Sequence, residues 1–157
     1  MGQISDCVNR LAASATFAMM QKSNELAAQG VNVVNMSVGE PDFNTPDYVK
    51  NAAKQAIDEN YSTYSPVPGY MSLRKACSDK LKRENNLDYA PTQIVVSTGA
   101  KQSLCNAIMA VVNPGDEVLL PSPCWVSYPE MVKLAGGVPV VIKTGIEKDL
   151  KVTEQQI

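Results

Sequence analysis

The sequence predicts an α/β fold in which short strands alternate with helices. Three apolar runs, at 94–97, 117–120 and 138–142, are typical of strands that are covered on both faces. The gaps between them, with helical patterns at 101–112 and 125–135, are long enough for the crossovers that join parallel strands. We therefore expect a mostly parallel central sheet that is flanked by helices. Pro139 favours the start or the edge of a sheet for the third strand, because proline cannot donate to the ladder.

The N-terminal half of the chain is predicted to be mainly helical. Gly30 is placed to end a first helix, and Thr45 and Pro46 are typical of a helix start, with Thr45 as the cap. The expected elements are a helix over 14–29, a short strand within 31–38, a loop over 39–46, a helix from about 46, an irregular stretch over 61–69 and a helix over 72–85.

The change of pattern near Pro46 divides the chain into two parts. Residues 1–46 are expected to form an N-terminal arm and part of a small domain, and residues 47–157 the first part of a larger α/β domain. Residues 153–157 are typical of the opening of another helix. We therefore expect the large domain to be incomplete at Ile157.

Composition excludes several kinds of chemistry. The 157 residues include 14 Lys and Arg and 16 Asp and Glu, for a net charge of −2, and no histidine. The Ser-His-Asp triad, the Cys-His pair and the HExxH zinc site are therefore impossible within this sequence. The charge is near neutral and forms no basic run, which argues against nucleic acid as a partner.

The cysteines and the apolar segments indicate a cytoplasmic protein. Cys7, Cys77, Cys105 and Cys124 lie far apart, so without histidine we expect no metal site. The first residues lack the apolar core of a secretory signal. No apolar stretch approaches the ~20 residues of a membrane span.

A first candidate site is the segment Ser97-Thr98-Gly99-Ala100-Lys101-Gln102, which follows a predicted strand and opens a helix. Exposed backbone N–H groups at a helix start suit an anion such as a phosphate. Gly99 would allow the backbone to approach it closely. The segment matches neither GxGxxG nor the Walker pattern. An ordinary strand-to-helix turn is the alternative.

Three further candidates lie in other loops. Trp125 follows the next predicted strand, at the sheet edge where ligands of parallel sheets gather, and its indole could stack on a flat ligand ring. The alternative is a tryptophan that merely packs its helix. Gly39 could present its backbone from a rigid loop, or belong to a plain linker. Tyr64, beside Pro66, could bind a phosphate oxygen, or be a surface turn residue.

Taken in order, these segments carry a resemblance to a known family. The motifs VGEPDF, YSPVPGYMSLR, STGAKQ, NPGDEV and PSPCWVSYPE together resemble the N-terminal part of class I aminotransferases. These are pyridoxal 5′-phosphate (PLP) enzymes of fold type I, and the bacterial aspartate aminotransferases are the most similar subgroup. The resemblance covers the chain from about Ser14 to its end. It implies the N-terminal part of the PLP-dependent transferase fold.

The resemblance also implies roles for single residues. Gly99, Ala100 and Lys101 would cradle the cofactor's phosphate, and Trp125 would stack on its pyridine ring. Tyr64 would reach the phosphate held by the other subunit of a homodimer. Gly39, Trp125 and Thr16 would contribute to binding of the amino acid and 2-oxo acid substrates.

The resemblance assigns no catalytic residue to this chain, since the family's Schiff-base lysine lies in a segment beyond Ile157. Lys101 belongs to the phosphate turn and is not its substitute. We therefore expect amino transfer, with aspartate as the expected donor, from the complete enzyme and not from residues 1–157 alone. A sibling PLP enzyme, such as an aromatic or alanine-type aminotransferase or a lyase, is one alternative. A non-catalytic phosphate- or PLP-binding module is the other.

Overall fold

The computed structural model describes residues 4–157. Contacts within the chain divide it into two compact units. The first unit joins the residues up to Gly39 with Leu104–Ile157, and the second is Glu40–Ser103. This grouping follows contacts inside the chain, so the boundary expected near Pro46 stays a prediction.

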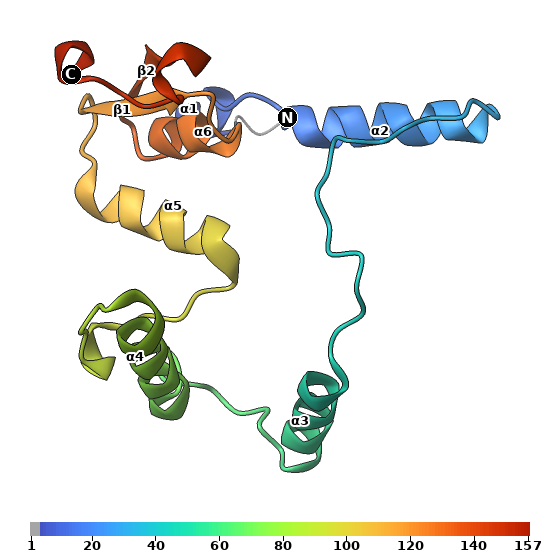
Figure 1. Ribbon diagram of the computed structural model, residues 1–157, viewed down its shortest axis with the longest axis vertical. Coiled ribbons are helices and arrows are strands. Elements are labelled where there is room, and N and C mark those ends of the chain that lie inside the picture. Colours follow the sequence, from blue (N-terminus) through green and yellow to red (C-terminus); the bar gives the residue numbers. More distant parts are fainter. Residues whose placement is uncertain (1–3) are drawn as a thin grey trace. The chain divides into compact units, whose positions relative to one another are not determined.

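The sheet of the first unit is a parallel pair, as the sequence predicts. Strands β1 (Glu117–Ser122) and β2 (Val138–Lys143) run parallel, with Glu117 opposite Val138 and Ser122 opposite Lys143. Helix α6 (Ser127–Leu134) makes the crossover between them (Figure 1). Pro139 is tolerated inside β2 because, among the described residues, the sheet has only these two strands and each is an edge.

The core of this unit lies between α6 and the two strands. Val132 on α6 is completely buried and Met131 beside it nearly so, against Leu120 of β1 and Ile142 of β2. Gly137, just before β2, allows the chain to pass close to this core. A Cβ at Gly137 would lie 2.7 Å from Val112 Cγ1.

Two helices precede the sheet in the first unit. A short helix α1 (Asp6–Asn9) contacts α6. Helix α2 (Ala15–Ala28) confirms the predicted helix and ends before Gly30, which has a φ of +81° that favours glycine. The chain then turns and runs back alongside α2 (Figure 1).

The strand predicted within 31–38 is wrong for the structure described here. Residues 31–36 form no ladder and stay irregular. A local turn follows, in which Asn35 Oδ1 accepts hydrogen bonds from Ser37 N–H and Oγ–H. Alternating apolar residues make a strand only when a neighbouring strand pairs with them, and none of the described strands does so.

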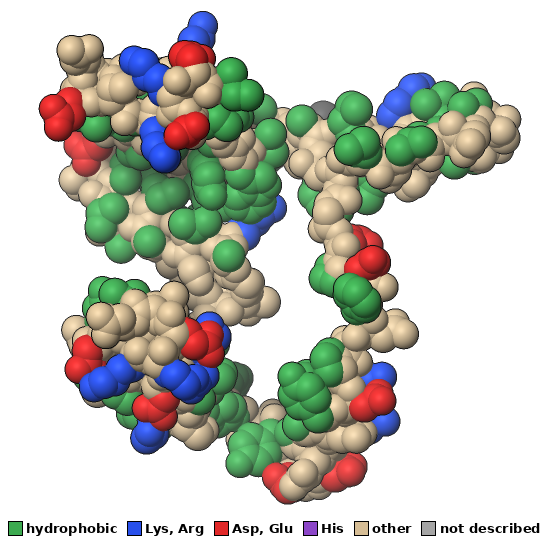
Figure 2. All heavy atoms as spheres, in the orientation of Figure 1, with side chains coloured by type: hydrophobic (Ala, Val, Ile, Leu, Met, Phe, Trp, Pro, Cys, Tyr) green, Lys and Arg blue, Asp and Glu red, His purple; other side chains and the backbone are tan. Residues whose placement is uncertain are grey.

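The second unit consists of helices α3 (Asp47–Asp58) and α4 (Met71–Asn85), a short 3₁₀ turn at Pro91–Gln93 and the start of α5 (Gly99–Val111). The N-cap of α3 is Pro46 and not Thr45, so the predicted cap is wrong by one residue. Figure 2 shows charged side chains gathered over α4. Lys75 with Asp79 and Lys80 with Glu84 form ion pairs along it.

The strand predicted at 94–97 is also absent from the described residues. The segment instead packs against α4 and the loop before it. Val96 N–H donates to the Pro68 carbonyl at 3.0 Å, and Arg74 Nε–H donates to the Ile94 carbonyl at 2.8 Å. Arg74 is 8% exposed and is the buried side chain of this unit as far as the structure describes it. The Ile94 carbonyl is therefore bound by a side chain and not by a neighbouring strand.

Residues Glu154–Gln156 form a short 3₁₀ turn after Thr153. Over residues 4–157, the structure contains no helix with the length and apolar character that a bilayer crossing requires.

Candidate functional site

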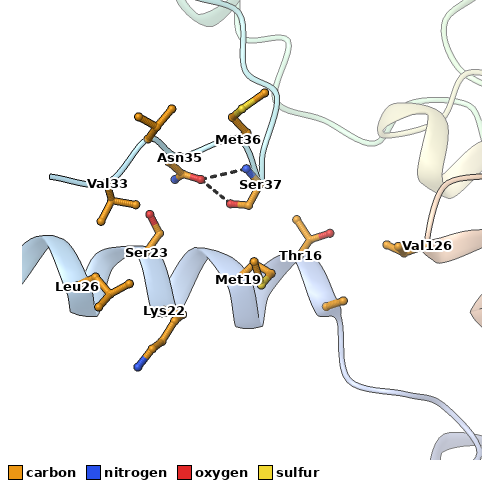
Figure 3. A pocket seen from close by; sticks show the side chains of 12 residues that line it. Thr16, Met19, Lys22, Ser23, Leu26, Val33, Asn35, Met36, Ser37 and Val126 are labelled. Carbon is orange, nitrogen blue, oxygen red and sulfur yellow. Dashed lines mark hydrogen bonds between the residues drawn. The ribbon is translucent and has the colours of Figure 1, made fainter. Parts of the chain in front are cut away.

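A groove of about 510 Å³ lies in the first unit, between α2 and the chain that returns beside it. Its apolar walls come from Met19 and Leu26 of α2 and from Val33 and Met36 of the returning chain (Figure 3). Val126, which precedes α6, lines it at the end where α2 begins. The groove can therefore hold a small molecule that is partly apolar.

Thr16 is the predicted site residue that lines this groove. It lies in the first turn of α2 and is half-buried. Lys22, Asn35 and Ser37 also line the groove. The Lys22 ammonium group pairs with Glu25 at 3.4 Å, and Asn35 Oδ1 accepts hydrogen bonds from Ser37, so these polar groups have partners within the chain.

Trp125 and Gly39 are near in sequence to residues that line this groove. Trp125 directly precedes Val126, is 39% exposed and makes an edge-on contact with Tyr128, with ring centroids 5.5 Å apart. This contact supports the packing role, while the exposed part of the indole leaves area for a ligand. Gly39 is exposed, two residues after Ser37, and a Cβ there would meet nothing within 4 Å. Unit 1 therefore contains three of the predicted site residues.

The Gly99 turn lies in the second unit, at the start of α5. Gly99 has a φ of +82°, and nothing lies within 4 Å of where its Cβ would be. Gly99, Ala100 and Lys101 are exposed. Thr98 N–H donates to Gln102 Oε1, so a side chain of the helix itself caps this end. The Gly99 N–H donates to the Ser97 carbonyl at 2.9 Å, so the turn is closed by its own backbone groups. Anion binding at this turn stays a prediction.

Tyr64 is fully exposed in the loop that precedes α4. A phenol in this position packs on nothing within its own unit. This exposure fits both alternatives that the sequence leaves open, a residue that reaches another molecule and a surface turn residue.

One residue near the groove, Glu130, is not indicated as important by any motif in the sequence. Glu130 on α6 accepts a hydrogen bond from Ala12 N–H through Oε2 and one from Lys133 Nζ through Oε1, both at 2.8 Å. The hydrogen bond from Lys133, and after it that from Ala12, lower the pKa of Glu130 below its ordinary value. The carboxylate is therefore ionised at neutral pH.

Metal ligands do not cluster anywhere in residues 4–157: no group of three or more His, Cys, Asp or Glu side chains could hold an ion there. The four cysteines are free thiols.

Comparison with known proteins decides the family. The model of the family "Aminotransferase class I and II" matches residues 31–157. The chain belongs to this aminotransferase family. It is 49% identical, over all of its 157 residues, to the aspartate/prephenate aminotransferase of Cereibacter sphaeroides, and 45% identical over 150 residues to the aspartate aminotransferase of Bacillus sp. strain YM-2.

Solved structures give the aminotransferase fold directly. The aspartate aminotransferase of Thermus thermophilus, solved with maleate, superposes with a TM-score of 0.93 at 43% identity over 99% of this chain. The match takes in 41% of the Thermus chain, and this chain spans 39% of the Cereibacter protein's length. The family resemblance and the predicted fold class, the N-terminal part of the aminotransferase fold, are therefore confirmed. The roles of the single site residues stay predictions.

Proposed function

We propose that the full-length protein containing this chain transfers an amino group between an amino acid, with aspartate as the preferred donor, and a 2-oxo acid, with PLP as the cofactor. The observation that carries the proposal is the aminotransferase family match over residues 31–157. The aspartate preference is supported by the similarity to the Cereibacter and Bacillus aminotransferases. The homodimer and the cytoplasmic location remain parts of the same proposal.

The residues of this chain fit PLP in two respects. The positive φ and the open surroundings of Gly99 leave room for a phosphate at the start of α5. The partly exposed indole of Trp125 offers an aromatic surface to a pyridine ring. When bound, PLP supplies an aldehyde that takes up the amino group and a ring that holds the electron pair released at the α-carbon.

Each residue then has a binding task and not a chemical one. Gly99, Ala100 and Lys101 would hold the phosphate at the positive end of α5, with the Gly99 N–H exchanging the Ser97 carbonyl, 2.9 Å away, for a phosphate oxygen. Trp125 holds the ring in place. Tyr64 would donate a hydrogen bond from its phenolic O–H to the phosphate of the other subunit's cofactor.

Substrate binding falls to the first unit. Thr16 faces the groove with its hydroxyl, and Gly39 offers a backbone N–H to a substrate carboxylate. These contacts would orient the substrate's α-carbon, and the apolar side chains beside Thr16 would contact the rest of the substrate. The proton-abstracting lysine is expected outside this chain, so residues 1–157 alone are proposed to be inactive.

The test is an assay of the full-length protein with PLP, an amino donor and 2-oxoglutarate. We expect aspartate to be the best donor. Alanine or an aromatic amino acid as the best donor would favour a sibling aminotransferase, and binding of PLP without turnover would favour the non-catalytic module. Borohydride reduction should label one lysine of the full-length protein. A stoichiometric label on Lys101 would contradict its place in the phosphate turn.

Trp125 variants test the cofactor site separately from turnover. We expect Trp125→Ala to weaken PLP binding by roughly 3- to 10-fold, because a stacked aromatic pair contributes about 0.5–1.5 kcal/mol. Trp125→Phe, which keeps an aromatic face, should retain most of the affinity. The dissociation constant is measured from the absorbance of bound PLP. Equal affinities of the wild type and Trp125→Ala would assign the indole to packing alone.

A further inference from the structure

The carboxylate of Glu130 joins two segments that are far apart in the sequence. Its Oε2 accepts the Ala12 N–H at 2.8 Å, across a separation of 118 residues, and its Oε1 accepts Lys133 Nζ at 2.8 Å. The side chain is 25% exposed, so water screens it only in part. Each carboxylate oxygen thus has its own donor, and the α6 side chain is tied to the backbone before α2.

Ala12 lies three residues before α2, so its hydrogen bond to Glu130 holds the chain that leads into the first turn of this helix. Ser14, the N-cap residue, forms no side-chain cap hydrogen bond in the described structure. The first turn of α2 therefore lacks the local device that usually fixes a helix start. The hydrogen bond from Ala12 to Glu130, two residues earlier, anchors the chain that leads into this turn.

Glu130 on α6 holds the segment before α2, and α2 and the residue that precedes α6 both border one end of the groove. Thr16 of α2 and Val126 at the start of α6 both line it (Figure 3). A change in the distance between α2 and α6 would therefore change the groove at that end. Glu130 acts from outside the groove, since it does not line it, and its hydrogen bond holds the backbone three residues before α2.

We propose that Glu130 is a positioning residue for substrate binding: by holding the Ala12 N–H, it keeps the first turn of α2, with Thr16, at the distance from α6 that the substrate requires. The proposal rests on the proposed function, because that function makes Thr16 a substrate contact. Glu130 itself touches neither substrate nor cofactor. Its effect should therefore appear in substrate affinity and not in the chemical step.

The choice of variants follows from the two hydrogen bonds. Glu130→Ala removes both acceptors. Glu130→Gln keeps one carbonyl oxygen for the Ala12 N–H, but its amide NH₂ then faces the Lys133 ammonium group, so part of the link survives. The matched control is Glu84→Gln on α4. Glu84 also has a lowered pKa through Lys80 and Arg83, but these two partners lie on α4 and not on the segment before α2.

The first readout is steady-state kinetics of the full-length holoenzyme with aspartate and 2-oxoglutarate. We expect Glu130→Ala to raise the KM for aspartate about tenfold with kcat within about twofold, since a charge-assisted hydrogen bond is lost outside the reacting atoms. Glu130→Gln should give an intermediate KM, and Glu84→Gln the wild-type value. An unchanged KM in Glu130→Ala, or an equal rise in Glu84→Gln, would overturn the proposal.

The second readout is amide hydrogen exchange over residues 10–16, which needs no activity. We expect exchange there to become about tenfold faster in Glu130→Ala while the amides of β1 and β2 are unchanged. If the β1 and β2 amides also exchange faster, the alanine variant has destabilised the whole first unit. The same measurement on the milder Glu130→Gln then decides whether Glu130 holds residues 10–16. Unchanged exchange over residues 10–16 would overturn the positioning role.

The two readouts separate this proposal from the function on which it rests. An inactive wild-type protein would overturn the proposed function, and hydrogen exchange alone would then decide whether Glu130 holds α2. Faster exchange with an unchanged KM would show that the link is merely structural and would overturn the role in substrate binding.

Discussion

Gly137 offers a direct test of how tightly the first unit is packed. A Cβ at this position would lie 2.7 Å from Val112 Cγ1, 3.1 Å from the Asp116 carbonyl oxygen and 3.1 Å from Val132 Cγ1. Val132 is completely buried, so it has no free space into which to move. The φ of Gly137 is outside the left-handed region, so a Gly137→Ala change brings a steric clash and no backbone strain.

The expected cost combines two opposing effects. Forcing an extra methyl group into a packed core costs about 1–3 kcal/mol. Replacing glycine by alanine restricts the unfolded chain and returns about 0.4–1 kcal/mol. We therefore expect Gly137→Ala to lower the free energy of unfolding of this unit by about 1–2 kcal/mol, which corresponds to roughly 5- to 30-fold faster exchange of amides that open with it.

The assay is hydrogen exchange of the amides next to the clash. Val138 N–H donates to the Asp116 carbonyl at 2.8 Å and Gly115 N–H to the Gly136 carbonyl at 3.0 Å, so both report on this part of the sheet. The amides of α4 serve as the internal control, because Gly137 and its three neighbours all lie outside Glu40–Ser103.

A double variant separates the clash from any other effect of the alanine. Val112→Ala removes the atom in the shortest contact, so the pair Val112→Ala with Gly137→Ala should cost less than the two single changes summed. We expect a coupling of about 0.5–2 kcal/mol. Strict additivity would refute the steric explanation, as would a Gly137→Ala protein whose β1 and β2 amides exchange at the wild-type rate.

Two further predictions follow from charged groups. The pKa of Glu130 is lowered mainly by the hydrogen bond from Lys133. Its stabilisation of the segment around Ala12 is therefore present above the ordinary glutamate pKa and is lost as the pH falls through the lowered pKa. Hydrogen exchange over residues 10–16, corrected for its intrinsic pH dependence, should rise in acid, and protection that does not change with pH would contradict this. Arg74→Ala should destabilise the second unit by about 1–3 kcal/mol, because the half-buried Ile94 carbonyl loses its charged donor at 2.8 Å and the buried Arg74 side chain loses its packing. Lys75→Ala, which removes an exposed ion pair with Asp79, should cost less than about 0.5 kcal/mol in the same urea unfolding measurement, and equal costs would contradict the role of Arg74.

Local signals predict the elements that depend on local interactions. Gly30 ends α2 where the sequence places the end, because a positive φ is a property of that single position. The strands β1 and β2 are also predicted, since each apolar run finds the other as its parallel partner. The runs at 31–38 and 94–97 have similar composition, but a strand forms only with a neighbour. In the second case the Val96 N–H is taken by the Pro68 carbonyl instead.

The candidate site likewise contains residues that the sequence suggests and one that it does not. Gly99 and Trp125 are detectable in the sequence because their residue types carry the property that matters, a positive φ in one case and a flat ring in the other. Glu130 is not detectable, because its partner is a backbone N–H 118 residues away. A backbone N–H is present at almost every position, so no residue type in the sequence indicates such a contact.

The two halves of the proposed cofactor site depend on different sources of stability. Trp125 precedes α6, whose Val132 and Met131 lie in the apolar core of the first unit. The turn at Gly99 belongs to the second unit, where the buried side chain of the described structure is the polar Arg74. Overpacking at Gly137 should therefore weaken the hold on the cofactor ring before it affects the phosphate turn, and loss of Arg74 should do the reverse. If both turns hold PLP, as proposed, affinity for PLP should fall in either variant, whereas inorganic phosphate, which is proposed to bind at the Gly99 turn alone, should bind less well only when Arg74 is changed.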